Sequence, residues 1–435
     1  MNENDVEALL ETTALVPAPS SRRAPPAVRP WQGRLMTAAA LLVCAAVLAA
    51  LFVAPSRVAP TAPSQDELQK TLDAILKRLG DESIEARDAA MKELRGFLDG
   101  DAKAELVQGR LSKLGADARA RVEEELERFV SRRHGRIAYQ SGLELRVVDW
   151  NGRNPGRLAA DRNPPIGVEW APDFSRAAYT SGNCIEVVGP DGERLKRINC
   201  GSREPHGVSW SPDGKRLTYW TWSTGDAGCR KVWVGEVDGE QKQLTDEQSL
   251  ETHPRWSPDG TWIAFWNDEG SLLLMHPDGR ERHALATLNT KGVEPTCLWT
   301  RDGKALLAAG AEDARIVQLD GRERGRLEGW GWNWQWSPDG TRLVFERENN
   351  IWVVDGDLKT AKALTAEARE NRSPAWSLDG RMIAFLSGRD DPRERGVKGF
   401  SPRLELYVME AGGANPVRLT TEGVQSRPSW MRDER

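Results

Sequence analysis

The sequence predicts an all-β, seven-bladed propeller that follows a transmembrane helix and a small α-helical segment, and three observations carry that prediction. A form of Trp-Ser-Pro-Asp-Gly occurs seven times at intervals of 37 to 54 residues, the spacing of propeller blades. A long apolar stretch without charge lies near the N-terminus, and a segment with helical periodicity follows it. The repeat tryptophans are Trp170, Trp210, Trp256, Trp299, Trp336, Trp376 and Trp430.

The N-terminal part of the chain is interpreted as a tail and a membrane anchor. Residues 1–34 are rich in Pro, Ser and charges and are expected to form a disordered cytoplasmic tail. Residues 35–54 are the predicted transmembrane anchor, in which Leu35–Val53 holds 19 residues without a charge. At ~1.5 Å per residue this stretch spans about 28 Å, close to the apolar thickness of a bilayer.

The orientation of the anchor follows from the arginines around it. Four arginines precede the span and one follows it closely, so the positive-inside rule places the N-terminus in the cytoplasm and the rest in the periplasm. A cleaved signal peptide is the alternative interpretation, but the leader is long and lacks a small-x-small cleavage site. The arginines are Arg22, Arg23, Arg29 and Arg34 before the span, and Arg57 after it.

Two segments separate the anchor from the repeats. Residues 55–64 are rich in Pro and Ala and are predicted to be a linker. Residues 65–133 are predicted to be helical, and Ser64-Gln65-Asp66-Glu67 reads as a capping box. HEAT-like helical units and a stalk that packs on the propeller or on a second copy are both open interpretations. The predicted helices begin near Gln65 and cover Ile84–Leu98, Ala102–Leu114 and Ala116–Val130.

The propeller is predicted to cover residues 136–435, with four strands in each repeat. Pro, Asp and Gly in the motif suit a tight turn, because Pro presets φ, Asp bonds the backbone and Gly adopts positive φ. Calcium binding by these aspartates is the alternative. Arg136–Ala160 supplies three strands without a preceding Trp strand, and Gln425–Trp430 supplies one strand with none after it. Joining them closes a seven-bladed ring, whereas a six-bladed ring with extra terminal strands is the alternative.

The repeat segments resemble a known family. Trp-Ser-Pro-Asp-Gly, Ile-Trp-Val-Val-Asp-Gly, Ala-Leu-Thr at Ala363–Thr365 and Arg-Leu-Thr at Arg418–Thr420 are similar to the propeller repeats of TolB and its WD40-like (PD40-type) relatives. The resemblance implies the fold of residues 136–435 and leaves the activity open, because such repeats serve many roles.

Composition and motifs favour a binding module. The chain has a net charge of −5 and no run of basic residues, so the sequence predicts no basic surface for nucleic-acid binding. G-x-S-x-G, H-E-x-x-H, C-x-x-C and P-loop motifs are absent from the sequence, so we expect no catalysis and no cofactor. The predicted function is a membrane-anchored scaffold or sensor of the bacterial envelope, and a transmembrane regulator of a cytoplasmic factor is one alternative.

The predicted binding site lies at one mouth of the channel, where residues just before each repeat Trp form a polar ring. Trp330 and Trp332 alternate with polar residues ahead of Trp334 and Trp336, so period two places four indoles on one strand face. Trp330 and Trp332 are predicted to form a platform for a protein, peptide or glycan partner, with packing between blades as the alternative. The ring consists of His206, Thr252, His253, Thr296, Asn333, Arg372 and Arg427.

Two further hypotheses concern cysteine and histidine. Cys184 and Cys200 are placed nearly opposite each other across a hairpin, which predicts a disulfide in an oxidising compartment; two buried thiols are the alternative. Some TolB-like propellers resemble oligogalacturonate lyases, which hold a metal with histidines at the channel mouth. That resemblance makes a metal-dependent polysaccharide lyase the second alternative function, with His206 and His253 as its metal candidates, although we expect no metal.

Overall fold

A computed structural model describes residues 64–79, 83–98, 101–222, 229–245, 250–366, 370–391 and 403–432. The predicted tail, the predicted transmembrane anchor and nearly all of the predicted linker lie outside these residues. Within the described part, no helix combines the length and the apolar character needed to cross a membrane.

The helical segment contains four α-helices, as its periodicity predicts. They are α2 (Gln65–Leu79), α3 (Ile84–Phe97), α4 (Asp101–Gln108) and α5 (Ala116–His134), with a 3₁₀ turn at Leu111–Lys113. The capping box of α2 forms, because the Ser64 backbone N–H donates to Glu67 Oε2 at 2.8 Å and the Glu67 N–H donates to Ser64 Oγ at 3.3 Å. The third helix is shorter than predicted, since Gly109 follows its last residue.

Residues 136–432 contain seven antiparallel sheets of four strands each, so the predicted seven-bladed propeller is confirmed. The first strands of the blades are β28 (Ser429–Met431), β4 (Ile166–Trp170), β8 (Glu204–Trp210), β12 (Thr252–Trp256), β16 (Thr296–Trp299), β20 (Trp332–Trp336) and β24 (Asn371–Trp376). The second strands are β1 (Arg136–Ser141), β5 (Ala177–Ser181), β9 (Arg216–Trp222), β13 (Ile263–Trp266), β17 (Ala305–Ala309), β21 (Arg342–Arg347) and β25 (Met382–Ser387).

The remaining strands complete each blade outward. The third strands are β2 (Glu144–Asp149), β6 (Cys184–Val188), β10 (Arg230–Glu236), β14 (Ser271–Met275), β18 (Asp313–Gln318), β22 (Asn350–Asp355) and β26 (Glu405–Glu410). The fourth strands are β3 (Gly156–Ala160), β7 (Arg194–Asn199), β11 (Gln241–Gln243), β15 (His283–Thr287), β19 (Glu323–Glu328), β23 (Ala361–Ala363) and β27 (Val417–Arg418). Blade one is β28 with β1–β3, and blades two to seven follow in chain order.

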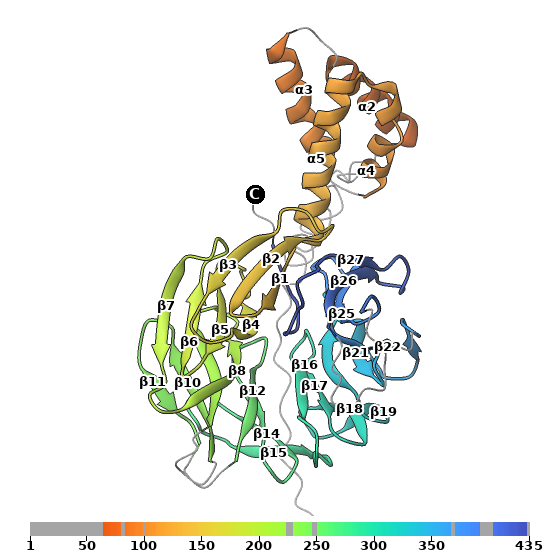
Figure 1. Cartoon of the computed structure of the whole chain (residues 1–435). Helices are drawn as coiled ribbons and strands as arrows, with labels where there is room; N and C mark the ends of the chain where they lie inside the picture. The colour runs from red at the N-terminus through yellow and green to blue at the C-terminus, as the bar shows by residue number, and fades with distance from the viewer. Residues whose placement is uncertain are drawn as a thin grey trace, which may run out of the picture. The chain divides into compact units, whose positions relative to one another are not determined.

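The ring closes through strands from the two ends of the propeller. Strand β28 pairs antiparallel with β1, with Trp430 opposite Ile137 and Ser429 opposite Ala138. Figure 1 shows β1 and β2 between the sheet of β4–β7 and the sheet of β25–β27. Gln425 adds a hydrogen bond between the two ends of the propeller, because its Oε1 accepts the Gly142 N–H at 2.7 Å. The six-bladed alternative is therefore excluded.

The repeat tryptophans hold neighbouring blades together. Three indoles donate a hydrogen bond to a carbonyl on the inner strand of the preceding blade: Trp210 to Glu169 (3.0 Å), Trp299 to Arg255 (3.1 Å) and Trp430 to Ala375 (2.9 Å). Three arginines of a preceding blade lie over an indole: Arg176 over Trp210 (5.2 Å), Arg216 over Trp256 (4.6 Å) and Arg342 over Trp376 (4.8 Å). Five of the seven repeat tryptophans therefore contact the preceding blade in one of these two ways, which gives the repeat a structural role.

The motif aspartates serve their own turns. Asp339 Oδ1 accepts hydrogen bonds from the Ser337 hydroxyl at 2.5 Å and from the Thr341 backbone N–H at 3.0 Å. These bonds, led by the Ser337 hydroxyl, lower the pKa of Asp339 to about 2. Asp213 and Asp259 are bonded in the same way by Ser211 and Ser257. This bonding is the turn chemistry that the motif predicts.

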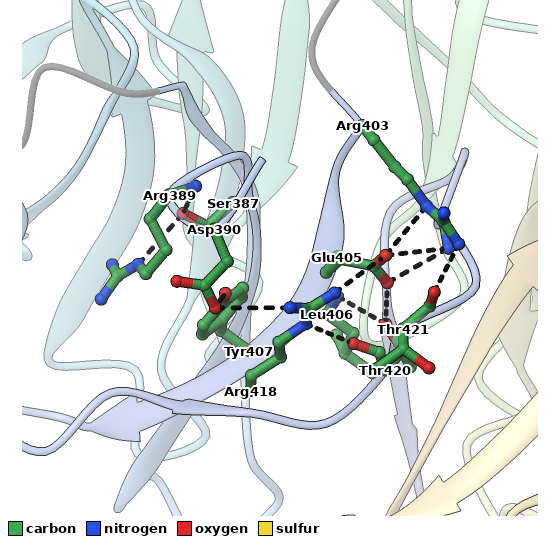
Figure 2. Close-up of polar contacts among 11 residues, drawn as sticks. Ser387, Arg389, Asp390, Arg403, Glu405, Leu406, Tyr407, Arg418, Thr420 and Thr421 are labelled. Atoms are coloured by element: carbon green, nitrogen blue, oxygen red, sulfur yellow. Dashed lines mark hydrogen bonds and ion pairs between the residues drawn. The ribbon is translucent and has the colours of Figure 1, made fainter. Parts of the chain in front are cut away.

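Threonines of the Leu-Thr repeats form hydrogen bonds with the third strand of their blade. The Thr420 hydroxyl accepts the backbone N–H of Leu406 at 2.9 Å and donates to Glu405 Oε2 at 2.7 Å. Figure 2 shows the Glu405 carboxylate between two guanidinium groups, at 3.0 Å from Arg403 Nε and 3.3 Å from Arg418 Nη2. Equivalent threonines accept a third-strand N–H in two other blades, Thr245 from Val232 and Thr365 from Ile351, both at 3.0 Å.

Candidate binding site

The inner strands carry a feature that alternation in the sequence does not show. Five of them have a β-bulge just before the repeat Trp, and in each the third residue before that Trp has positive φ. Bulges re-aim side chains at the rims of barrels and next to functional sites. The positive-φ residues are Gly167 (68°), Gly207 (58°), His253 (55°), Asn333 (53°) and Ser373 (53°).

A cavity of about 550 Å³ lies along the central channel, and residues of the inner strand of every blade line it. Seven tryptophans contribute to its wall, together with polar and small side chains. The polar members are Glu169, Ser209, Arg255, Gln335, Arg427 and Ser429. A second cavity of about 150 Å³ shares Arg255 and Arg427 with the first, so the two cavities meet at these arginines. We call the smaller cavity the mouth pocket.

The mouth pocket gathers five of the residues that the sequence assigned to the binding site. They are His253, Thr296, Trp332, Asn333 and Arg427. Asn333 is fixed by Glu346, whose Oε2 accepts its side-chain amide at 3.1 Å and the Ser373 backbone N–H at 3.1 Å. The pocket is therefore built by blades one, four, five and six.

The other predicted binding residues lie outside the lining of both cavities. Arg372 pairs with Glu370 and its side chain is 42% exposed. His206 packs on Trp220, at 4.6 Å between ring centroids, and Trp220 also contacts His253 at 6.1 Å. Trp330 is exposed and Trp332 is half-buried, with their rings edge to face at 6.0 Å. The Trp330 and Trp332 side chains form an aromatic pair, which we call the indole pair.

The predicted face of four indoles is wrong. The bulge between Trp332 and Gln335 shifts the register of β20, so Trp334 turns into the core. There it stacks on Phe345 at 4.0 Å and donates from Nε1 to the Gly331 carbonyl at 2.9 Å. The bulge thus separates the indole pair from the two indoles that pack inside.

Two arginines and two carboxylates line the two cavities, namely Arg255, Arg427, Glu169 and Glu294. Arg255 Nη1 lies 3.3 Å from Glu169 Oε1. Arg427 Nη2 donates to the Trp334 carbonyl at 3.4 Å, and among the described residues no carboxylate forms an ion pair with Arg427. Burial lowers the pKa of Arg427 to about 10, while Glu169 raises it and Arg255 lowers it further. Arg427 is therefore charged at neutral pH.

Sequence reasoning missed Glu169, Arg255 and Gln335 as channel residues. Each stands immediately before a repeat Trp, at positions 170, 256 and 336, and each lines the larger cavity. Their common position, one residue before a repeat Trp, could have identified them, because equivalent residues of all blades surround the channel axis.

His253 and His206 are neutral at neutral pH. Burial lowers the pKa of both, and that of His253 falls to about 4, with Arg255 and Arg230 lowering it further. Among the described residues, His206 Nε2 and His253 Nδ1 are buried without a hydrogen-bond partner. Protonating either ring in place would therefore leave a buried N–H donor without an acceptor.

The depressed pKa of His253 predicts a loss of stability in acid. In the unfolded chain His253 takes up a proton near its ordinary pKa of 6.5, whereas in the folded chain it does so near 4. Between these values the unfolded state binds the extra proton, so stability falls as pH falls, by on the order of 3 kcal/mol. Urea unfolding from pH 7.5 to 4 measures this loss.

The matched variant is His253→Asn, since asparagine tolerates the positive φ of that position. Its stability should depend less on pH across the same range. An unchanged pH dependence in the variant would contradict the assignment to His253.

The residues at the mouth do not fit a metal site. Among the described residues there is no group of three or more His, Cys, Asp or Glu side chains arranged to hold a metal ion. His253 Nε2 lies 4.0 Å from Glu294 Oε2, and His206 faces Trp220. A metal requires three or four converging donors, which this pair of imidazoles does not supply.

The structure corrects the register predicted for the cysteine pair. Asn199, not Cys200, lies opposite Cys184 in the pairing of β6 with β7. Cys184 and Cys200 are both reduced thiols in the structure. Burial raises the pKa of the Cys200 thiol to about 11. Oxidation of Cys184 and Cys200 to a disulfide stays a prediction.

Comparisons with known proteins support the fold. No protein-family model matches the chain. A solved oligogalacturonate lyase in complex with manganese is 17% identical, with a TM-score of 0.50 over 59% of this chain and 84% of that one. TolB from Acinetobacter baumannii is 19% identical, with a TM-score of 0.44 over 73% of each chain. At 17% identity the likeness to the lyase is one of fold alone. The seven blades of the structure bear out the propeller that the TolB-like repeats predict.

One curated relative also matches part of the chain. The uncharacterized peptidase YuxL of Bacillus subtilis (strain 168) is 27% identical over 181 residues, which are 38% of this chain. The match covers 27% of that relative's length.

Proposed function

We propose that this chain is a binding protein of the bacterial envelope, whose propeller binds a protein or peptide partner at the mouth pocket and the indole pair. The observation that carries the proposal is the convergence of His253, Thr296, Asn333 and Arg427 from four blades on one pocket. Trp332 belongs to both the pocket and the indole pair. Propellers bind ligands at such mouths, and exposed indoles beside polar groups are the residues that most often anchor partners.

The indole pair distinguishes a binding surface from a merely structural rim. Trp330 is 42% exposed, and its contact with Trp332 leaves the two rings perpendicular. Large apolar side chains that stay exposed together mark interaction sites more often than isolated ones do. Arg347 fixes this segment, because its guanidinium donates to the carbonyls of Glu328, Gly329 and Trp330 at 2.9–3.0 Å. The pair is therefore presented on an ordered backbone.

The envelope location of the proposal rests on the sequence. Residues 35–54 are apolar, and the surrounding arginines favour a cytoplasmic N-terminus. A propeller on the periplasmic side would then act as a scaffold for an envelope complex or as a sensor. In an alternative form of this proposal, the protein regulates a cytoplasmic factor through residues 1–34. Capture of a cytoplasmic protein by the isolated tail would support that form.

The double variant Trp330→Ala with Trp332→Ala should reduce partner binding by about 30-fold or more, the effect of losing one or two anchor residues. Its melting temperature should stay within a few degrees of wild type, because Trp330 is exposed and Trp332 is only half-buried. Crosslinking of the full chain in intact cells, followed by identification of the captured proteins, measures binding.

The control variant is Leu195→Ala, which removes a side chain that is 48% exposed on the fourth strand of blade two. It should keep the captured partners. Equal capture by the double variant and wild type would rule out the indole pair as the anchor. A collapse of folding in the double variant would instead support packing between blades.

A metal-dependent polysaccharide lyase remains the second candidate through fold likeness alone. The donor set around His206 and His253 does not fit a metal site, as described above, so no catalytic step is assigned to it. Stoichiometric manganese or zinc in the purified full chain, lost in His253→Asn, would support this candidate against the binding function.

A further inference from the structure

Arg427 occupies a special place in the channel. It lines both the 550 Å³ cavity and the mouth pocket, and Arg255 is the other charged side chain that does so. The residue precedes β28 by two positions, so the strand that closes the ring also carries this guanidinium into the channel. Any ligand that passes from the mouth pocket into the larger cavity must pass these two arginines.

Arg427 has no ion-pair partner among the described residues. Arg255 is held by Glu169 at 3.3 Å and donates to the Val208 carbonyl at 3.3 Å. Arg427 has the Trp334 carbonyl at 3.4 Å as its hydrogen-bond acceptor, a long contact for a guanidinium with five N–H groups. Glu169 and Glu294, the two carboxylates that line the cavities, therefore leave the Arg427 guanidinium without a direct partner. An unpaired charge surrounded by protein is costly, so a fold that keeps one usually uses it.

We propose that the channel binds a ligand carboxylate against Arg427, with Arg255 and Glu169 setting the charge of the site. The inference rests on the proposed function, since it names the ligand chemistry of the same mouth. A ligand carboxylate would supply the acceptor that Arg427 lacks, whereas a doubly charged phosphate would meet stronger repulsion from Glu169 and Glu294. A guanidinium fork also matches the two oxygens of a carboxylate.

The cavity beyond the arginines suits the rest of such a ligand. Its volume of about 550 Å³ is within the range of small-ligand sites, and seven tryptophans contribute to its wall. The carboxylate can come from a small organic acid or from the C-terminus of a peptide. Both sources present the same group to Arg427, and the probes below separate them.

The test uses the purified full chain and four probes at constant ionic strength: acetate, N-acetylglycine, N-acetylglycinamide and inorganic phosphate. N-acetylglycine carries a peptide-like carboxylate, and N-acetylglycinamide has the same shape without the charge. The two carboxylates should raise the melting temperature by about 2–5 °C at saturation, because they bind the folded state alone. Tryptophan fluorescence, reported by the indoles of the channel wall, should saturate over the same concentrations. Tighter binding of N-acetylglycine than of acetate supports a peptide terminus, and equal binding supports a small acid.

Three variants give effects of different sign. Arg427→Met should lose the carboxylate-dependent shift, while its melting temperature without ligand should equal or exceed that of wild type, since an unpaired charge has been removed. Glu169→Gln should bind N-acetylglycine about 10-fold more tightly, because the competing carboxylate is gone. Arg322→Met is the control, because that guanidinium is 81% exposed, pairs with Asp320 and lines neither cavity, and it should bind as wild type does.

Several results would overturn the proposal. They are carboxylates that stabilise wild type no more than N-acetylglycinamide, phosphate that stabilises as strongly as acetate, and an Arg427→Met variant that keeps the shift. A large fall in the melting temperature of ligand-free Arg427→Met would show a structural arginine instead. These measurements need no partner protein. A negative result for the carboxylates would therefore not affect the crosslinking test of the indole pair, and a negative crosslinking result would not affect the carboxylate site.

Discussion

Deletion of residues 425–435 should abolish cooperative unfolding of the propeller, because it removes the strand that closes the ring. Without β28, strand β1 loses its partner for Ile137 and Ala138, and an unpaired edge is exposed beside blade seven. The Trp430 side chain is 5% exposed in a cluster that includes Val408 and Leu386, and that cluster would lose its cover. Calorimetry of the full chain and the truncated chain measures the difference.

A point variant separates the strand from its tryptophan. Trp430→Ala should cost about 3–5 kcal/mol, because it leaves a cavity and removes the 2.9 Å hydrogen bond from Nε1 to the Ala375 carbonyl. Trp222→Ala is the matched control, since that indole is 42% exposed and should cost far less. Wild-type unfolding of the truncated chain would show that the ring does not depend on β28.

Replacing Glu405 by Ala should destabilise the protein by about 2–4 kcal/mol, a large effect for one polar side chain. The carboxylate is 4% exposed and accepts the Gly423 N–H and the Thr420 hydroxyl, both of which stay buried after its removal. Arg403 and Arg418 are 51% and 34% exposed, so both can turn to water, which keeps the cost below that of a fully buried ion pair. Urea unfolding of the full chain measures the loss.

Two matched variants show which part of Glu405 matters. Glu405→Gln keeps an oxygen acceptor for Gly423 and Thr420, so it should lose less than half as much stability as Glu405→Ala. Glu323→Ala removes a carboxylate that is 43% exposed and pairs with Arg315 at 2.7 Å, and it should cost under about 1 kcal/mol. A Glu405→Ala variant as stable as Glu323→Ala would mean that the network of Figure 2 contributes little.

The blades were predictable from sequence because their signals are local and repeated. A form of Trp-Ser-Pro-Asp-Gly marks the turn after six of the seven inner strands. The three strands of Arg136–Ala160 and the one strand of Gln425–Trp430 together make up one four-stranded blade. The structure adds the reason for the repeat, since Trp210, Trp299 and Trp430 each bond to the preceding blade. The Leu-Thr repeat likewise has a structural reason, because the Thr420 hydroxyl accepts a hydrogen bond from the Leu406 N–H.

The details of the site were harder to predict because they depend on single-residue irregularities. A bulge in β20 turns Trp334 inward while Trp330 stays exposed, and alternation along the sequence cannot reveal such a bulge. The pairing of Cys184 with Asn199 was missed by one residue for a similar reason, since the hairpin turn sets the register. Arg427 was identified from its position before the last repeat Trp, but its lack of a carboxylate partner emerged only with the channel geometry.

Amide hydrogen exchange of the full chain tests the closed ring most directly. Those N–H groups of Ser429–Met431 that bond to β1 should exchange as slowly as the N–H groups of β13 in blade four, because both would open only in global unfolding. Exchange of Ser429–Met431 at the rate of an unstructured peptide, with β13 still protected, would contradict the closure of the ring and the channel built on it.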